Sequence, residues 1–394
     1  IHMHELMQEN KIATHSNHGL FQMAGLIALS CSLPFLSLAD EGKKIATKLI
    51  KQMLSEHFAG DGLHKEHSPV YHHYMTNYVS ILLDSGFMDG SDDFINLAQN
   101  ALDAASWLCQ PDENILPFGD TPPVHTERRV NFSVHKMNSK PCAPAGLKYF
   151  DEGGLVIHSS YNDDGVSSGY LAFSAAFHSR QHKHADDFNF QLFHDGQGIF
   201  TDAGTFTYQY DLEERMFIES TRSHNTVEID GNNYSRYLKD AYGSAINFAV
   251  EVGNCIVIDS EISRKRLVPA DIPNNKIKMD VAIDVDIVQR RMLVYHPDRF
   301  LLIFDHLKSD ENHDYTQWLH LYPNQHIREE NGKMLISKGQ KKRITAIIHP
   351  ILPEQPKYSM FYGNNKPRLQ GWMSENGHAL KETNSIGIGA KGKD

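Results

Sequence analysis

Hydrophobic and polar residues follow two different patterns along this chain, and the pattern changes between about residues 108 and 154. Before the change, apolar residues recur at intervals of three or four positions, which buries one face of an α-helix. Ser16 or Asn17 can begin the first of these helices, because serine and asparagine are favoured N-caps. We therefore expect helices over residues 16–32, 40–57, 71–83 and 94–108.

After residue 154 the chain consists of short runs rich in β-branched and aromatic residues, separated by turn sequences such as Asp195-Gly196. Such runs are typical of β-strands. Helices followed by strands favour an α+β protein with a helical domain beside an antiparallel β-sandwich. Because 394 residues are too many for one ordinary core, we expect two domains, at 1–125 and 126–394. The predicted strands are 155–158, 170–175, 188–193, 226–229, 245–252, 292–295 and 300–304.

The apolar run at 20–39 has two other interpretations. It could be the core of a signal peptide, but Lys11 is the one unambiguous positive charge before it. It could be a transmembrane helix, but it is too polar and is interrupted by Pro34. We therefore expect a buried helix here and no membrane partner.

Composition narrows the possible partners. The formal net charge of −11 gives no overall positive field, so we expect no nucleic-acid partner. A polyanionic ligand would have to meet a local cluster of basic residues. The four cysteines, Cys31, Cys109, Cys142 and Cys255, have no C-x-x-C spacing, which indicates neither a disulfide framework nor a cysteine metal site. Nothing in the sequence indicates an oligomeric state.

Histidines and a carboxylate form the most informative polar pattern. His182 and His184 precede or open an alternating, half-buried strand, and in extended backbone residues two apart point the same way. Asp202 and His224 add a carboxylate and a third imidazole, a set suited to zinc. In a chain with 24 histidines the H-x-H pair can also arise by chance.

The same residues carry a resemblance to the heparinase II/III family of polysaccharide lyases. HSRQHKHADDFNFQLFHDGQGIFTDAGTFTYQY and RSHNTVEIDG resemble the core of that family, while SNHG at 16–19 and DGLHKEHSPVYHHY at 61–74 resemble its two toroid motifs. The resemblance implies an incomplete (α/α) toroid, joined to a multi-sheet β-sandwich, with further helices preceding it in the family. It also implies an anionic, uronate-containing polysaccharide as substrate and a periplasmic or secreted location in a bacterium.

Cleavage of a uronate polymer by β-elimination requires the sugar carboxylate to be neutralised while charge develops on it. The resemblance assigns this role to Asn17, with His18 beside it. Asn17 could instead be a helix N-cap and nothing more.

The reaction also needs a base for the weakly acidic C–H and an acid for the departing oxygen. The resemblance assigns these roles to Tyr71 and His182, and an imidazole can act as a base near neutral pH without any tuning. Tyr74 or Tyr78 could replace Tyr71. Tyr210 is a weaker candidate for the acid, because Tyr208 competes for that role.

The resemblance places His184, Asp202 and His224 at the ligand positions of one Zn2+ ion, which we expect to be structural. A zinc ion with an open coordination position could instead activate water and favour hydrolysis. We expect substrate contacts from four further residues, each of which could equally form a salt bridge: Glu66, Arg180, Arg222 and Arg236.

Two other functional classes remain open. A glycoside hydrolase would need two carboxylates set apart across the scissile bond, and no pair stands out among Asp61, Glu66, Asp186 and Asp187. A non-catalytic glycan-binding protein would be favoured by loss of the reactive residues, which are all present. A lyase is therefore the leading hypothesis.

Overall fold

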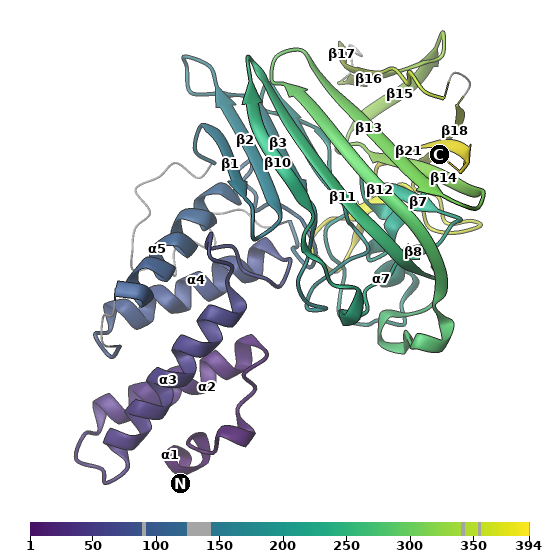
Figure 1. Cartoon of the computed structure of the whole chain (residues 1–394). Helices are drawn as coiled ribbons and strands as arrows, with labels where there is room; N and C mark the ends of the chain where they lie inside the picture. Colours follow the sequence, from purple (N-terminus) through teal and green to yellow (C-terminus); the bar gives the residue numbers. More distant parts are fainter. Residues whose placement is uncertain (89–91, 124–142, 340–342, 354–355, 394) are drawn as a thin grey trace.

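The computed structural model describes residues 1–88, 92–123, 143–339, 343–353 and 356–393. Its first part is helical, and the four helices predicted from the sequence are confirmed, each with ends within two residues of the expected ones. Figure 1 shows them as a group apart from the strands. They are α2 (Asn17–Ser32), α3 (Ala39–His57), α4 (Pro69–Asp84) and α5 (Asp92–Trp107), and a short helix that was not predicted, α1 (His2–Leu6), precedes them.

The helices pack through the apolar faces that their sequences predict. Leu20 and Met23 of α2 and Met53 of α3 are fully buried in one hydrophobic cluster. Gly19 lets α2 lie close to both the preceding segment and α3, because a Cβ there would lie 2.4 Å from the carbonyl oxygen of Ala13 and 2.9 Å from Sδ of Met53. The apolar run at 20–39 is thus a packed helix with a following loop. In the part of the chain that the structure describes, no helix is long and apolar enough to cross a membrane.

The second part consists of sheets, and every strand pair in the described ranges is antiparallel. One five-stranded sheet has the order β1 (Gly146–Phe150), β2 (Leu155–Tyr161), β3 (Ser167–Ser174), β5 (Asn189–His194), β6 (Gln197–Phe200). Another has the order β10 (Ile246–Val252), β11 (Cys255–Val268), β12 (Ile283–His296), β13 (Phe300–Ser309), with β8 (Asn233–Tyr234) paired to β11.

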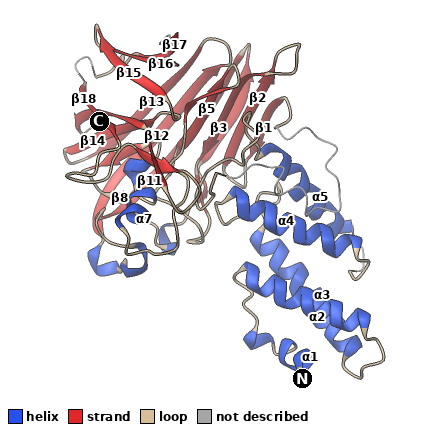
Figure 2. Ribbon diagram, turned by 180° about the vertical axis from the view of Figure 1, so that it is seen from behind, coloured by secondary structure: helices blue, strands red, loops and turns tan. Residues whose placement is uncertain are grey.

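The remaining strands form smaller sheets (Figure 2). Four strands have the order β18 (Lys357–Tyr362), β21 (Asn384–Gly392), β14 (His313–His320), β7 (Val227–Ile229). Three have the order β15 (Gln325–Glu330), β16 (Lys333–Lys338), β17 (Arg343–Ile348). Two pairs complete the set: β4 (Ala176–Phe177) with β9 (Gly243–Ser244), and β19 (Trp372–Ser374) with β20 (Leu380–Glu382).

The largest hydrophobic cluster lies between the two five-stranded sheets, where Phe173 of β3 and Phe190 of β5 pack with Ile258 of β11 and Leu293 of β12. The opposite face of the first sheet buries Phe193 of β5 in a second cluster. Strand β5 is therefore covered on both faces.

Two expectations about the second part need correction. The half-buried strand expected after the histidines is β5, and it is almost completely buried, because its polar positions also face protein: Gln191 donates a hydrogen bond to Gln110 and Asn189 donates one to Asp202. A short helix, α7 (Glu213–Ile218), interrupts a region expected to form strands. Its Phe217 and Ile218 are buried against Leu369, so tertiary packing stabilises it.

The predicted boundary at residues 125–126 lies outside the described residues, as does Cys142. None of the described cysteines, Cys31, Cys109 and Cys255, is joined to another of them by a disulfide bond.

Candidate active site

Three aromatic side chains from distant parts of the chain meet beside the start of α4. The ring of His182, in the loop before β5, stacks on the ring of Tyr71 with centroids 3.7 Å apart. The hydroxyl of Tyr71 lies 3.1 Å from the hydroxyl of Tyr208, which in turn lies 3.5 Å from Nδ1 of His182. The sequence placed Tyr71 and His182 in one site, and the structure brings them into contact.

The backbone at His182 is not the extended segment that the H-x-H pattern predicts. His182 has φ of 56°, in the left-handed region, and lies in a turn. The turn brings its carbonyl oxygen to the segment at Gly119, where a Cβ would lie only 2.6 Å from it. The two imidazoles still converge, because both reach the same carboxylate: Nδ1 of His182 lies 3.1 Å and Nε2 of His184 lies 2.9 Å from Asp120.

Asp120 is a buried hub that sequence reasoning missed. Besides the two histidines, it accepts two hydrogen bonds from Arg215, at 2.6 and 3.1 Å, and one from the hydroxyl of Thr205, at 2.9 Å. Burial alone would raise the pKa of Asp120, but the hydrogen bonds of both histidines and the charge of Arg215 hold it well below its usual value. Asp120 is therefore a fixed negative charge beneath His182.

Glu66 lies on the other nitrogen of the same ring, with its carboxylate 3.4 Å from Nε2 of His182. Burial would lower the pKa of His182, but Asp120 and Glu66 outweigh it and raise the pKa above the usual value. His182 was expected to act as a base without any shift of its pKa. The structure instead biases its imidazole towards the protonated form. Glu66 was expected to contact the substrate. It is instead only 7% exposed, and its carboxylate contacts the His182 ring.

The structure places Tyr208, rather than Tyr210, against the two central residues. Burial, the charge of Asp120 and the hydrogen bond with Tyr71 raise the pKa of Tyr208, so its phenol holds its proton firmly. The ring of Tyr210 lies 5.3 Å from the Arg215 guanidinium and 6.4 Å from the ring of Tyr208. Within the described ranges, no hydrogen bond or ring contact joins Tyr210 to Tyr71.

Asn17 and His18 are the first two residues of α2. Ser16 occupies the N-cap position, so Asn17 is not the N-cap that it could have been. Asn17 is partly exposed and His18 is exposed. Among the described residues, no hydrogen bond, ion pair or ring contact links either of them to Tyr71 or His182.

The three arginines expected at the substrate lie in different surroundings. Arg180 is exposed in the loop that carries His182. Arg236 is buried and bonded to Glu219 and to the carbonyl oxygen of Lys183. Arg222 is also buried, with Nε and Nη1 lacking hydrogen-bond partners, and burial together with the nearby charge of Arg368 lowers its pKa to about 10.

The residues predicted to bind zinc lie near one another but do not form a complete set. Asp202 accepts a hydrogen bond of 2.7 Å from Nδ1 of His224, and the rings of His184 and His224 lie 5.4 Å apart. Nδ1 of His184 and Nε2 of His224 are buried without a hydrogen-bond partner, as free metal donors would be. Over the ranges described, no group of three or more His, Cys, Asp or Glu side chains has the geometry of a metal site. Zinc therefore stays a prediction.

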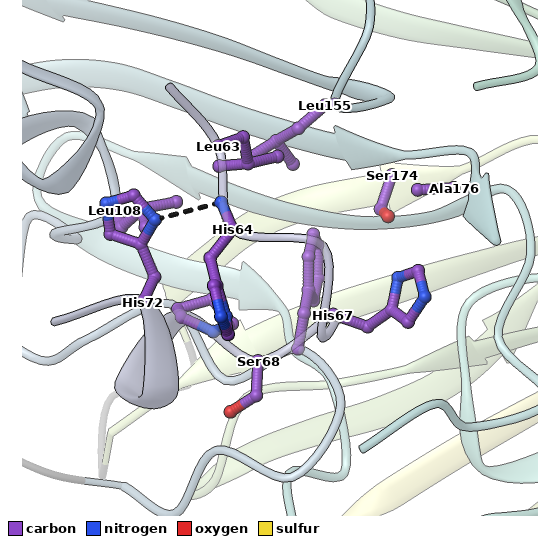
Figure 3. A pocket seen from close by; sticks show the side chains of 12 residues that line it. Leu63, His64, His67, Ser68, His72, Leu108, Leu155, Ser174 and Ala176 are labelled. Atoms are coloured by element: carbon purple, nitrogen blue, oxygen red, sulfur yellow. Dashed lines mark hydrogen bonds between the residues drawn. The ribbon is translucent and has the colours of Figure 1, made fainter. Parts of the chain in front are cut away.

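A small cavity of about 40 Å³ lies beneath the first turn of α4 (Figure 3). His64, His67 and His72 line it, and the backbone N–H of His64 donates to Nδ1 of His72 at 3.1 Å. Burial lowers the pKa of His64 to about 3 and that of His72 to about 4, so both rings are neutral. The neutral rings of His64 and His72 thus line the space beneath the turn that carries Tyr71.

Sequence comparison identifies two adjacent family domains. The family model described as Heparinase II/III N-terminus matches residues 2–140, and the one described as Heparinase II/III-like, C-terminal matches residues 143–350. A search of curated proteins finds no match to the chain.

Solved structures with the same fold include a protein named heparan sulfate lyase and one named heparinase III. A mutant heparan sulfate lyase from Pedobacter heparinus is 15% identical, with a TM-score of 0.74 over 100% of this chain and 60% of that one. A structure named heparinase III is also 15% identical, with a TM-score of 0.74 over 99% of this chain and 61% of that one. The chain thus spans about three fifths of the length of these proteins, and at such low identity the likeness establishes the fold alone.

Proposed function

Because the chain belongs to the heparinase II/III family, we propose that it is a polysaccharide lyase that cleaves a uronic-acid-containing polysaccharide by β-elimination. The substrate class that the neighbours' names favour is a glycosaminoglycan. The observation that carries the proposal is the contact of Tyr71 with both His182 and Tyr208.

Each of the three residues has a role that its surroundings support. Asp120 and Glu66 bias His182 towards its protonated form, so the ring suits stabilisation of negative charge better than proton abstraction. Tyr71 is then the base that takes the proton from the carbon next to the carboxylate. Tyr208, which holds its proton firmly, is the acid that protonates the departing oxygen.

The proton balance closes through the hydrogen bond between the two tyrosines. Tyr71 starts as a phenolate and becomes a phenol when it takes one proton from the substrate, and Tyr208 becomes a phenolate when it gives one to the leaving group. Transfer of a proton from Tyr71 to Tyr208 along the 3.1 Å O···O contact then restores the starting phenolate and phenol. The reaction adds no water, so one product carries a carbon–carbon double bond at its new non-reducing end.

Asn17, with His18 beside it, remains the proposed donor to the sugar carboxylate, on the strength of the family motif. Asn17 begins α2 and Tyr71 lies in the first turn of α4, so both stand at helix starts. Arg180 is the exposed cation nearest in sequence to His182 and is the proposed partner for a second substrate anion.

His184, Asp202 and His224 are the proposed zinc ligands, supported by the two buried imidazole nitrogens that lack partners. A bound zinc ion would supply a structural anchor for the loop that carries His182. The finer architecture, part of an (α/α) toroid joined to a β-sandwich, and a periplasmic or secreted location also belong to this proposal.

A direct assay tests the proposed function. Uronate polymers that differ in sulfation are incubated with the protein, and absorbance in the ultraviolet is followed for the double bond of the product, which is conjugated to the carboxylate. Rising absorbance with a glycosaminoglycan is expected. Release of reducing ends with no rise in absorbance would indicate a glycoside hydrolase instead.

A further inference from the structure

Four strands of the second five-stranded sheet, β10, β11, β12 and β13, carry apolar residues on both faces. Its inward residues, such as Ile258 and Leu293, belong to the largest hydrophobic cluster. Its outward residues include six apolar side chains that we call the outer sheet face: Phe248, Val250, Val257, Val294, Leu302 and Phe304. Figure 1 is viewed from this side, with the strands in the foreground.

The outer sheet face is partly exposed, and Asp259 and Met292 lie in it between Phe248 and Phe304, with Asp259 buried against Arg290. Phe248, Val250 and Phe304 are 39%, 42% and 48% exposed. The strand register places Val250, Val257, Val294 and Leu302 in one row across all four strands. An antiparallel sheet that faces water normally has polar residues on that side, and a large apolar patch marks an interaction surface.

A charged row borders the patch. Glu261 of β11 and Arg290 of β12 are exposed cross-strand neighbours, one side-chain row beyond Phe304. With strands about 4.8 Å apart and a rise of about 3.4 Å per residue, the apolar and charged rows together cover roughly 400 Å². Standard interfaces bury about 800 Å² on each partner, so this face suits a reversible complex rather than a permanent one.

We propose that the outer sheet face binds a second copy of this chain, forming a two-fold dimer of stacked sheets. A two-fold axis parallel to the strands places β11 opposite β12 of the partner and β10 opposite its β13. Glu261 then faces the partner's Arg290, and the symmetry creates this pair twice. In the same arrangement Phe248 faces the partner's Phe304. Each row of side chains therefore lies opposite the same row of the second copy.

Analytical ultracentrifugation over about 1 to about 100 µM protein, a range that brackets micromolar affinities, tests the dimer. The wild type should form a reversible dimer, and Phe304→Glu should raise its dissociation constant at least about 30-fold, as loss of an interface anchor does. Ile347→Glu is the control, because Ile347 is 56% exposed on β17, outside the outer sheet face. A wild-type protein that stays monomeric at the highest concentration, or a dimer unaffected by Phe304→Glu, would overturn the proposal.

A charge swap tests the orientation. Glu261→Arg alone should weaken the dimer by placing two cations opposite each other, and adding Arg290→Glu should restore it. Thermal melting confirms that each variant is folded, which matters because Arg290 also bonds Asp259. If the double variant dimerises no better than the single one, the proposed axis is wrong. Neither residue contacts Tyr71 or His182, so lyase activity should be unchanged and the two proposals fail independently.

Discussion

The imidazole of His182 lies against the phenol of Tyr71, with ring centroids 3.7 Å apart and ring planes at 22°. A face-to-face contact of this kind leaves the edges of both rings free for polar partners. His182 uses its two nitrogens to contact Asp120 and Glu66, and Tyr71 uses its hydroxyl to contact Tyr208. The stack therefore joins an imidazole that Asp120 and Glu66 bias towards its protonated form to a pair of tyrosine hydroxyls.

Replacing Tyr71 with Phe removes the hydroxyl and keeps the ring on His182. If Tyr71 is the base, kcat should fall by about 10²–10⁴-fold, the usual contribution of a general base, with little change in KM. Tyr74→Phe is the matched control, because Tyr74 lies one turn along the same helix and is 41% exposed. Steady-state kinetics decides between them, and a larger loss in Tyr74→Phe would move the role to that residue.

The acid role is tested by comparing Tyr208 with Tyr210. Tyr208→Phe should lower kcat strongly on natural polymers, whose leaving group is a poor one, because the departing oxygen loses its proton donor. Tyr210→Phe should have a small effect, since Tyr210 contacts Arg215 and not Tyr71. On a substrate that carries a good leaving group, the fall in kcat caused by Tyr208→Phe should be smaller, because that group needs less help from a proton donor. If Tyr210→Phe is the slower variant on the natural polymer, the assignment is reversed.

Asp120→Asn should destabilise the fold as well as the site. The change leaves the buried cation of Arg215 with Glu219 as its remaining carboxylate partner, and breaking a buried pair costs roughly 3–5 kcal/mol. Urea denaturation measures the free energy of unfolding. Asp195→Asn, at a side chain that is 73% exposed, should change it by less than about 0.5 kcal/mol. Equal effects from the two substitutions would contradict the role of Asp120 as a buried hub.

Metal analysis of protein prepared without added zinc tests the proposed ion. One zinc per chain is expected, and its removal should lower the melting temperature, because a structural metal stabilises the folded state by binding to it. His224→Ala should abolish binding, whereas His194→Ala, at a partly exposed histidine outside the proposed set, should not. Protein that contains no zinc and gains no thermal stability from added zinc would rule the site out.

The helices could be predicted because each has its own amphipathic pattern, as in α3, where Leu49, Ile50 and Met53 lie on one buried face. Much of the sheet region could not. The second half of β11 reads Ser263-Arg264-Lys265-Arg266, and no apolar alternation marks it as a strand. Arg264 is buried there because it bonds Asp187, a partner far away in the sequence.

The site was predictable only where a family motif marked the residue. Tyr71 and His182 could be chosen in this way, and the structure places them in contact. Asp120 could not, because a single aspartate between Gly119 and Thr121 has no local signature, and its partners come from residues 182 to 215. The turn at His182 was missed for the same reason, since the segment at Gly119 that it contacts is distant in sequence.

The masses of the cleavage products test the central claim most directly. A uronate oligosaccharide of defined length is treated with the protein, and both fragments of each cut are weighed by mass spectrometry. Elimination adds nothing, so the account predicts that the two fragment masses sum to the mass of the substrate. A sum larger by one water would show hydrolysis and contradict the proposed chemistry of Tyr71 and Tyr208.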